Sequence, residues 1–444
     1  MAVSGININS GLGTGLDIGA TVDALIQAQS GPLTQLQNEQ QNLQIERTTV
    51  SSFASLLSNL KTAVDNLRDA GGAFDGVAAT SSNSGVATVS ADATAQPGKH
   101  TLLVNNLASG SAYYTAEQTS PTAALAQGSF QLQIGAVPAQ TITVDSSNNT
   151  LAGIATTING LGLGVQASVL QDANGARLSI SSTGTGAGSN INISADSVGL
   201  GFTKSSTGAD ASYSVDGVPL ASASNTVTGV LQGLTFNLAS LGSAAIAVSP
   251  DTAGAQNALG NFVSAYNSLT QSINSQFAVN PATGQAGVLS GDVNVRQLQQ
   301  EMLSDASING AGSSFNTLRS IGVEMQNDGT LQINQPVLTS ALNGNFGALK
   351  TMFQSTGGYG QQLGSDLVQA TDPTVGLLGS DGSGLDNQIT SIAAQIKTFN
   401  DYLNSQRTAL TQTYTNISVM LQQEPAQLAQ IQSLLGSNTT TTTK

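Results

Sequence analysis

The segment LQNEQQNLQIERTTVSSFASLLSNLKTAVDNL, residues 36–67, carries a leucine or valine at every seventh position. This spacing predicts a long helix with one continuous apolar seam. We expect the helix to run from Leu33 to Ala70, between Gly31-Pro32 and Gly71-Gly72. The seam positions are Leu36, Leu43, Val50, Leu57 and Val64. A second row follows the last three of these by three residues each: Phe53, Leu60 and Leu67.

The segment LDNQITSIAAQIKTFNDYLNSQRTALTQTYTNI, residues 385–417, repeats this spacing near the other end of the chain. It predicts a second long helix from about Asp386 to Leu421. Beyond Ile417 the spacing of seven restarts four residues later, which is a stutter that locally unwinds a supercoil. Pro425 predicts a break or kink there. The seam positions are Ile389, Ile396, Leu403, Leu410 and Ile417, with Leu385, Ile392 and Phe399 beside them.

Heptad patterns more often indicate packing within one chain than contacts between chains, so we expect the two ladders to pair as a helical leg. The residues predicted to pack this leg are Leu43, Val50, Leu57, Val64, Ile389, Ile396, Leu403 and Leu410. The outer segments 16–36 and 417–436 are amphipathic beyond the paired region, so we expect them to contact neighbouring subunits. The residues predicted to make those contacts are Leu16, Val22, Leu25, Leu33, Leu36, Leu421, Leu428, Ile431 and Leu435.

The middle of the chain has the texture of β-domains, with short β-branched runs separated by turn residues. A single helical segment, Leu151–Gly160, interrupts them, and helical patterns return at 259–277 and 293–307. The fold class is therefore predicted as α+β multidomain, with a discontinuous helical leg and two inserted β-rich head domains. The predicted division is 1–35 with 418–444 as partly disordered assembly segments, 36–73 with 252–417 as the leg, 74–112 with 205–251 as one head, and 113–204 as the second.

Charge is sparse in this chain of 444 residues: only 9% are charged and the formal net charge is −14. The 12 Lys and Arg residues form no basic stripe, which excludes nucleic acid and anionic membrane surfaces as expected partners. Cysteine is absent, which excludes disulfides and thiolate metal sites. No run of 18 apolar residues and no signal-peptide pattern is visible, so we expect no membrane insertion and an export route that leaves the N-terminus intact.

Candidate catalytic groups are few, and each has a simpler explanation. His100 is the only histidine, which excludes a two-histidine metal site, and we expect it at an ordinary surface position. The glycines of 11–15 lack the lysine and the preceding strand of a phosphate-binding loop. Turn and helix-cap roles are expected for Asp216, Asp251, Asp292 and Asp328, so no catalytic, cofactor or metal residue is predicted.

The chain resembles the flagellar filament cap proteins, also called hook-associated cap proteins, in order along nearly its whole length. The most specific matches are the opening SGLGTGLDI at 10–18, LSGD at 289–292 and NDGTL at 327–331. Residues 150–184 are similar to a short insert motif that flagellins also carry. The Gln-rich end with Pro425 and the Thr run at 439–443 depart from the family pattern.

This resemblance implies a structural role without bond chemistry and without a cofactor. It implies a ring of four to six copies, with five expected, at the distal tip of the extracellular flagellum. Flagellin would fold beneath the plate of head domains and join the filament between the legs. The implied partners are the other copies of the chain, flagellin, the hook–filament junction proteins, a cytoplasmic export chaperone and the flagellar type III export apparatus.

Two other function classes share parts of this sequence pattern. Flagellin and the hook–filament junction proteins have helical ends and β-rich middles, but the units at 289–292 and 327–331 argue against them. An extracellular β-rich adhesin would also have a middle rich in Ser, Thr and Gly. Filament formation by the purified chain would indicate flagellin, and carbohydrate binding by the head would favour the adhesin.

Overall fold

The computed structural model describes residues 17–282, 284–372, 374 and 376–436, without the side chains of 421–429 and 431–436. Its contacts divide the chain into two units. The helical unit takes its described residues from Met1–Arg68, Leu259–Leu338 and Thr351–Lys444. The β-rich unit consists of Asp69–Ala258 and Thr339–Lys350. Helices and antiparallel sheets together confirm the predicted α+β class.

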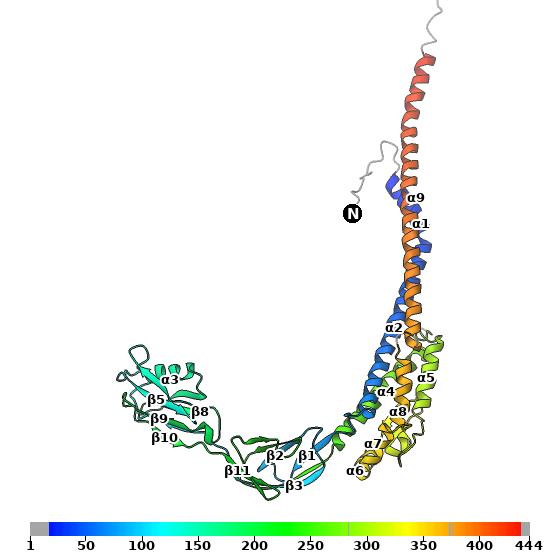
Figure 1. Cartoon of the computed structure of the whole chain (residues 1–444). Helices are drawn as coiled ribbons and strands as arrows, with labels where there is room; N and C mark the ends of the chain where they lie inside the picture. The colour runs from blue at the N-terminus through cyan, green and yellow to red at the C-terminus, as the bar shows by residue number, and fades with distance from the viewer. Residues whose placement is uncertain (1–16, 283, 373, 375, 437–444) are drawn as a thin grey trace, which may run out of the picture. The chain divides into compact units, whose positions relative to one another are not determined.

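Three helices, of which the first is short and the other two are long, form the framework of the helical unit, with α2 running beside α9 (Figure 1). The first of them begins where Asp17 Oδ1 accepts a hydrogen bond from Ala20 N at 2.9 Å, and it ends at the cap residue Ser30. The second accommodates Pro32 in its first turn, where a missing N–H removes no helical hydrogen bond. The bounds are α1 Ile18–Gln29, α2 Gly31–Arg68 and α9 Leu377–Gly436.

The structure corrects the predicted limits of the last helix. It begins at Leu377, nine residues before the predicted start at Asp386, and it continues through Pro425 to Gly436. The glycines in its first turns do not end it because the leucines beside them are packed: Leu378 and Leu385 are 4% and 7% exposed. The predicted break at Pro425 is wrong, because the helix continues for eleven residues beyond it, while a kink there stays a prediction.

Shorter elements complete the helical unit, and three of the helices have residues in both units. The predicted helices at 259–277 and 293–307 are confirmed. The three helices between 335 and 370 were not predicted. The bounds are α4 Thr252–Phe277, α5 Val293–Asp305, η2 Leu318–Ile321, β16 Val323–Met325, β17 Leu331–Ile333, α6 Gln335–Gly344, α7 Phe346–Gln354 and α8 Tyr359–Ala370.

One core of the β-rich unit lies between a five-stranded and a three-stranded antiparallel sheet. The strand orders are β1-β15-β3-β11-β12 and β13-β14-β2. Asp216 and Gly217 connect β11 to β12 with φ of 51° and 82°, the left-handed turn for which an Asp-Gly pair is the usual sequence. The bounds are β1 Val77–Ser81, β2 Ala87–Ala91, β3 Gly98–Asn106, β11 Ala211–Val215, β12 Val218–Ser222, β13 Thr226–Thr228, β14 Leu234–Leu238 and β15 Gly242–Pro250.

A second core of the β-rich unit lies around α3, between a four-stranded and a three-stranded sheet. The strand orders are β10-β4-β8-β7 and β6-β5-β9. The helix occupies the residues predicted for it, and Thr150 caps it by accepting a hydrogen bond from Gly153 N. The bounds are β4 Ala112–Tyr114, β5 Gly128–Ile134, β6 Gln140–Val144, α3 Leu151–Gly160, β7 Val165–Gln171, β8 Ala176–Ser182, η1 Ala187–Ser189, β9 Ile191–Ser194 and β10 Thr203–Ser206.

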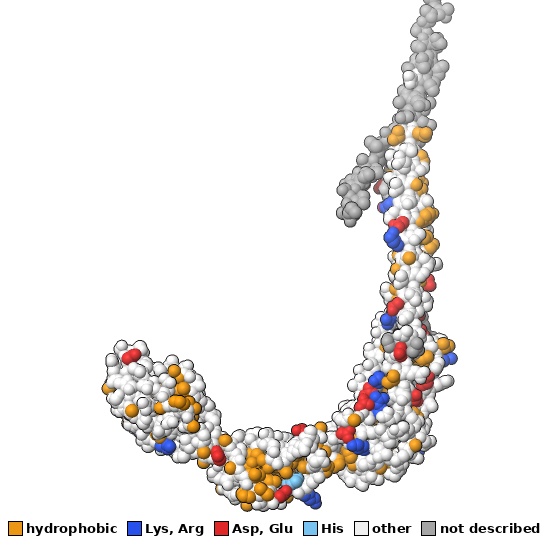
Figure 2. All heavy atoms as spheres, viewed as in Figure 1, with side chains coloured by type: hydrophobic (Ala, Val, Ile, Leu, Met, Phe, Trp, Pro, Cys, Tyr) orange, Lys and Arg blue, Asp and Glu red, His pale blue; other side chains and the backbone are white. Residues whose placement is uncertain are grey.

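The two β cores lie in the residue ranges that the sequence assigned to two head domains, while the four-part division of the chain stays a prediction. In the view of Figure 2, charged side chains gather mainly on the helical unit and are sparse over the β-rich unit. Among the described residues, no helix combines the length and the apolar character that a membrane crossing requires.

Candidate assembly surface

The residues predicted to pack the leg divide into a buried and a half-buried group. Val50, Leu57 and Val64 on α2 are each 1% exposed. On α9, Leu403 is buried, whereas Ile389, Ile396 and Leu410 are half-buried. Leu43, in the first half of α2, is also half-buried. The seam is therefore dry in the second half of α2 and partly open to solvent along α9.

Helix α1 packs against the middle of α9 through a small apolar cluster, which we call the α1 cluster. Its buried members are Ile18, Val22, Ile26 and Leu403. Leu33, Phe399, Leu410 and Tyr414 pack around them and stay partly exposed. Arg407 of α9 forms an ion pair with Asp23 of α1 at the same place. The predicted boundary at Gly31-Pro32 thus separates two helices that both contact α9.

The residues predicted to make assembly contacts are in different environments. Val22 is 2% exposed, so its side chain reaches a partner only when α1 leaves α9. Leu25, Leu33 and Leu36 are half-buried and present part of their surface. Leu16 lies outside the described residues. The four C-terminal positions lie on α9, where only the backbone is described: Leu421, Leu428, Ile431 and Leu435.

An apolar groove of about 810 Å³ lies along α9 beside the first turns of α2. Leu36, Phe399 and Tyr402 supply its large side chains, and Tyr402 is 49% exposed. Further along α9, Ile417, Val419 and Met420 are exposed, and Met420 is 71% exposed. The prediction missed Tyr402, Val419 and Met420 because they fall outside the strict spacing of seven. The signal for Tyr402 and Met420 is their helical spacing, since each follows a residue of the apolar pattern, Phe399 or Ile417, by three positions.

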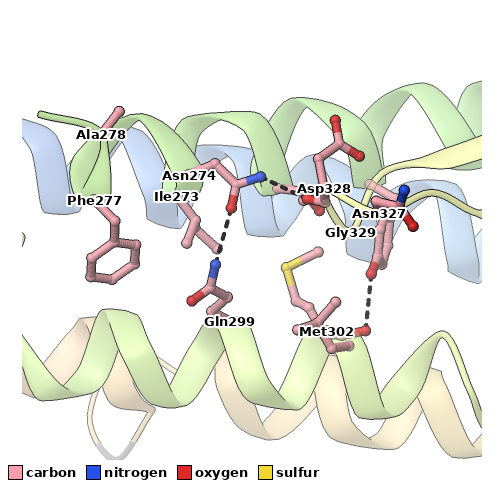
Figure 3. Close-up of a pocket in the computed structure, with 12 residues that line it drawn as sticks. Ile273, Asn274, Phe277, Ala278, Gln299, Met302, Asn327, Asp328 and Gly329 are labelled. Atoms are coloured by element: carbon pink, nitrogen blue, oxygen red, sulfur yellow. Dashed lines mark hydrogen bonds between the residues drawn. The ribbon is translucent and has the colours of Figure 1, made fainter. Parts of the chain in front are cut away.

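Figure 3 shows a second hollow, a pocket of about 450 Å³ between α4 and α5. Asn274 Nδ2 donates to Asp328 O at 2.8 Å, and Gln299 Nε2 donates to Asn274 Oδ1 at 3.0 Å (Figure 3). Asp328 is the one carboxylate of its lining, and its Oδ1 accepts hydrogen bonds from Thr330 N and Oγ1. These bonds hold the pKa of Asp328 below its ordinary value. The pocket therefore offers amide and apolar contacts, not an acid–base pair.

The expected turn and cap roles of four aspartates are confirmed. Asp292 caps α5, Asp251 Oδ1 accepts from Gly254 N at the start of α4, and Asp328 closes the β16–β17 turn. Asp216 Oδ2 lies 2.8 Å from His100 Nδ1, and its Oδ1 accepts from Thr101 N. The bonds from His100 and Thr101 lower the pKa of Asp216. Within the described residues, no group of three metal-ligating side chains lies close enough to hold an ion.

Comparison with known proteins gives one consistent result. Residues 14–111 match the family model for the flagellar hook-associated protein 2 N-terminus, and residues 208–425 match that for its C-terminus. The B-type flagellar hook-associated protein 2 of Pseudomonas aeruginosa is 30% identical over 410 residues, covering 84% of this chain and 85% of that protein. The flagellar hook-associated protein 2 of Escherichia coli K12 is 27% identical over 450 residues, covering 93% and 94%.

Among solved structures, the chain is similar to the D1-D2-D3 domains of the flagellar cap protein FliD from Escherichia coli. The TM-score is 0.54 at 26% identity, and the match covers 76% of this chain and 99% of that one. The similarity therefore extends to the arrangement of helices and sheets within the fold.

Proposed function

The chain belongs to the flagellar hook-associated protein 2 family, and from this premise we propose how its two units act in a flagellar cap. It is a cap protein of the bacterial flagellar filament, located outside the cell at the distal tip of the filament. The family match favours this role over flagellin, a junction protein or an adhesin. The role is structural, and we propose that it needs neither bond chemistry nor a cofactor.

The observation that carries the proposed mechanism is the attachment of α1 to α9. Among the described residues, four side chains are buried in the α1 cluster, and each contributes about 1.5–3 kcal/mol when fully buried. Ordering the twelve residues of α1 costs free energy of similar size, so the attachment is weak. We propose that α1 exchanges its contact with α9 for contacts with flagellin or a neighbouring copy when the protein sits on the filament.

The same mechanism assigns the outer part of α9 to assembly. Exposed apolar side chains at Ile417, Val419 and Met420 lead toward the ladder at 421–435. The nine proposed contact residues are Leu16, Val22, Leu25, Leu33, Leu36, Leu421, Leu428, Ile431 and Leu435. Few charges must be desolvated when such a surface forms a contact or leaves it, so the cap can change its contacts repeatedly while flagellin is added.

The proposed partners are flagellin, the hook–filament junction proteins and further copies of this chain in a ring of four to six, with five expected. Before export, a cytoplasmic chaperone and the flagellar type III export apparatus are proposed to handle the chain. Native mass spectrometry of the purified assembly measures the ring size directly. A species of five copies supports the expected number, and a stable monomer at micromolar concentration contradicts the ring.

The proposed assembly contact of the outer part of α9 is tested by replacing Leu421 and Leu428 with Asp. The variant is expressed in a bacterial strain whose own gene for this protein is deleted. We expect flagellin to move from filaments into the medium, because charged side chains cannot enter an apolar contact. The matched control places the same two charges at Thr408 and Gln412, which are exposed on α9, and should leave filaments intact. Wild-type filament length in the Leu421→Asp, Leu428→Asp strain would contradict the proposed contact.

A further inference from the structure

Helix α5 carries a carboxyl group at each of its ends, and each faces a carboxyl group on another helix. Asp292 is the residue that caps its beginning, and Asp305 is its last residue. Asp292 meets Asp381 of α9, and Asp305 meets Asp366 of α8. All four residues belong to the helical unit.

At the first end, the geometry assigns the negative charge to Asp292. Its Oδ1 accepts hydrogen bonds from Asn294 N at 2.7 Å and Val295 N at 3.1 Å, and a helix N-terminus favours an anion. Asp381 Oδ2 is buried and receives no hydrogen bond from a described residue. A proton on Asp381 would satisfy this oxygen and let the side chain donate to Asp292.

The charged groups around Asp381 do not stabilise its ionised form. Glu46 of α2 adds a third carboxyl group to the pair. Arg47 of α2 lines a neighbouring pocket with Gly382 and Asp372, but its Nε donates to Asp386 of α9 at 2.8 Å. Burial first, then Asp292 and Glu46, raise the pKa of Asp381 to about 6.

At the second end, Asp305 and Asp366 line one cavity of about 370 Å³ together with Glu301. The rest of its described lining is uncharged: Gln297, Ser304, Gln369, Ala370, Gly376 and Leu377. The C-terminal end of a helix disfavours an anion, which adds to the cost of ionising Asp305. Two tyrosines, Tyr266 of α4 and Tyr359 of α8, are the other titratable groups close to Asp305.

Neither tyrosine supplies a positive charge that would balance an ionised Asp305, and Tyr266 donates its hydroxyl to Met302 O. Burial raises the pKa of Tyr266 to about 12 and raises that of Tyr359 as well. Burial first, then Asp366 and Glu301, raise the pKa of Asp305 to about 7. The proton on Asp305, which faces Asp366, therefore persists to near neutral pH.

We propose that two shared protons, one at each end, fasten α5 to α9 and to α8, and that losing both as the pH rises releases α5. Because each folded-state pKa is raised above the ordinary value of about 4, the stabilisation is complete below that value. It is lost as the pH rises through about 6 and about 7. Release uncovers an apolar face, since Val295, Leu298 and Met302 of α5 are buried. This inference concerns the folded chain alone and does not depend on the proposed function.

The test is hydrogen–deuterium exchange of the full chain at about pH 5.5 and about pH 8, with rates corrected for the intrinsic effect of pH. We expect amides in 293–305 to exchange about a hundredfold faster at the higher pH, because two groups with folded-state pKa values of about 6 and about 7 together lose about two powers of ten of stabilisation between these pH values. Amides in the second half of α2 should not change. Equal corrected rates in 293–305 at both pH values would overturn the proposal.

Asn variants separate the shared protons from a general effect of pH. Asp305→Asn and Asp381→Asn supply an N–H donor that does not titrate, so the double variant should keep slow exchange in α5 at both pH values. The matched control, Asp401→Asn, removes an exposed carboxyl group of α9 that pairs with Lys397, and it should keep the pH dependence. An unchanged pH dependence in the double variant would contradict the assignment.

Infrared difference spectroscopy gives a second readout that does not rely on a variant folding normally. The carbonyl band of protonated carboxyl groups should persist in the wild-type chain to about pH 6–7, well above the ordinary range near 4. Loss of the whole band near pH 4 would overturn the proposal.

Discussion

Arg407 on α9 pairs with Asp23 on α1, although 384 residues separate them in the sequence. Their side chains are 50% and 61% exposed, and ion pairs at such positions contribute little to stability. The attachment of α1 therefore depends on the apolar side chains of the α1 cluster.

Val22→Asp should detach α1 from α9 and leave the rest of the helical unit folded. A charged side chain cannot stay at a position that is 2% exposed without a partner for its charge. Exchange of the amides in 18–29 should become as fast as in an unfolded peptide. Ala24→Asp, at an exposed position of the same helix, is the control and should keep the protection. Slow exchange in Val22→Asp would show that the α1 cluster is not the main attachment.

Leu57→Ala should destabilise the helical unit by about 2–5 kcal/mol, because it leaves a cavity at a position that is 1% exposed. The neighbouring half-buried Leu56 provides a matched change, and Leu56→Ala should cost about 1 kcal/mol. Urea-induced unfolding followed by the helical circular dichroism signal measures both. Equal losses in the two variants would contradict a seam that faces one side of α2.

Gly153→Ala should destabilise the β-rich unit, although alanine favours helices over glycine by about 1 kcal/mol. A Cβ atom at Gly153 would lie 2.7 Å from Asn148 O and 2.9 Å from its Cα, and backbone atoms cannot easily move away. Gly160, at the other end of α3, has nothing within 4 Å of a built Cβ. Gly160→Ala should therefore be neutral or stabilising, and a thermal unfolding midpoint that falls equally for both changes would argue against the close approach.

Asp216→Asn should lower the unfolding temperature of the β-rich unit near neutral pH but not in acid. The bonds from His100 and Thr101 lower the pKa of Asp216, so its contribution is present above the unfolded value of about 4 and is lost as the pH falls through the lower folded value. Asparagine tolerates the positive φ of this turn, so the change removes the charge and keeps the backbone. A difference from the wild type that persists at about pH 2 would show that the charge is not the cause.

Much of the helical framework could be predicted from sequence because its signals are periodic over many turns. The expected helix from Leu33 to Ala70 corresponds to α2, and Gly31-Pro32 marks the junction with α1. The Asp-Gly pair at 216–217 is a hairpin signal, and Leu151–Gly160 has the same limits in the sequence prediction and in the structure.

The missed elements are short, and tertiary contacts define them. Helices α6, α7 and α8 have only 10, 9 and 12 residues. Their apolar residues were available as a signal, since Phe346, Leu349 and Phe353 follow helical spacing in α7.

Strand β12 contains Pro219, which is tolerated because β12 lies at the edge of its sheet.

The candidate surface could be predicted only in part, because spacing in the sequence does not show which partner a seam meets. Leu33 was assigned to assembly and Leu410 to leg packing, yet both pack around the α1 cluster. Val22 looks available in the sequence and is covered by α9 in the folded chain. These burial states depend on the fold, because α1 packs against α9, a helix from the opposite end of the sequence.

The pairing of β1 with β15 has an evolutionary consequence. Val77 lies opposite Pro250, so the chain enters and leaves the five-stranded sheet on neighbouring strands. The segment between these two strands can therefore be lengthened, shortened or exchanged during evolution. The points where it begins and ends stay one strand spacing apart, about 5 Å. Recombination at this point would diversify the surface of the sheets and leave the inherited framework of long helices unaltered.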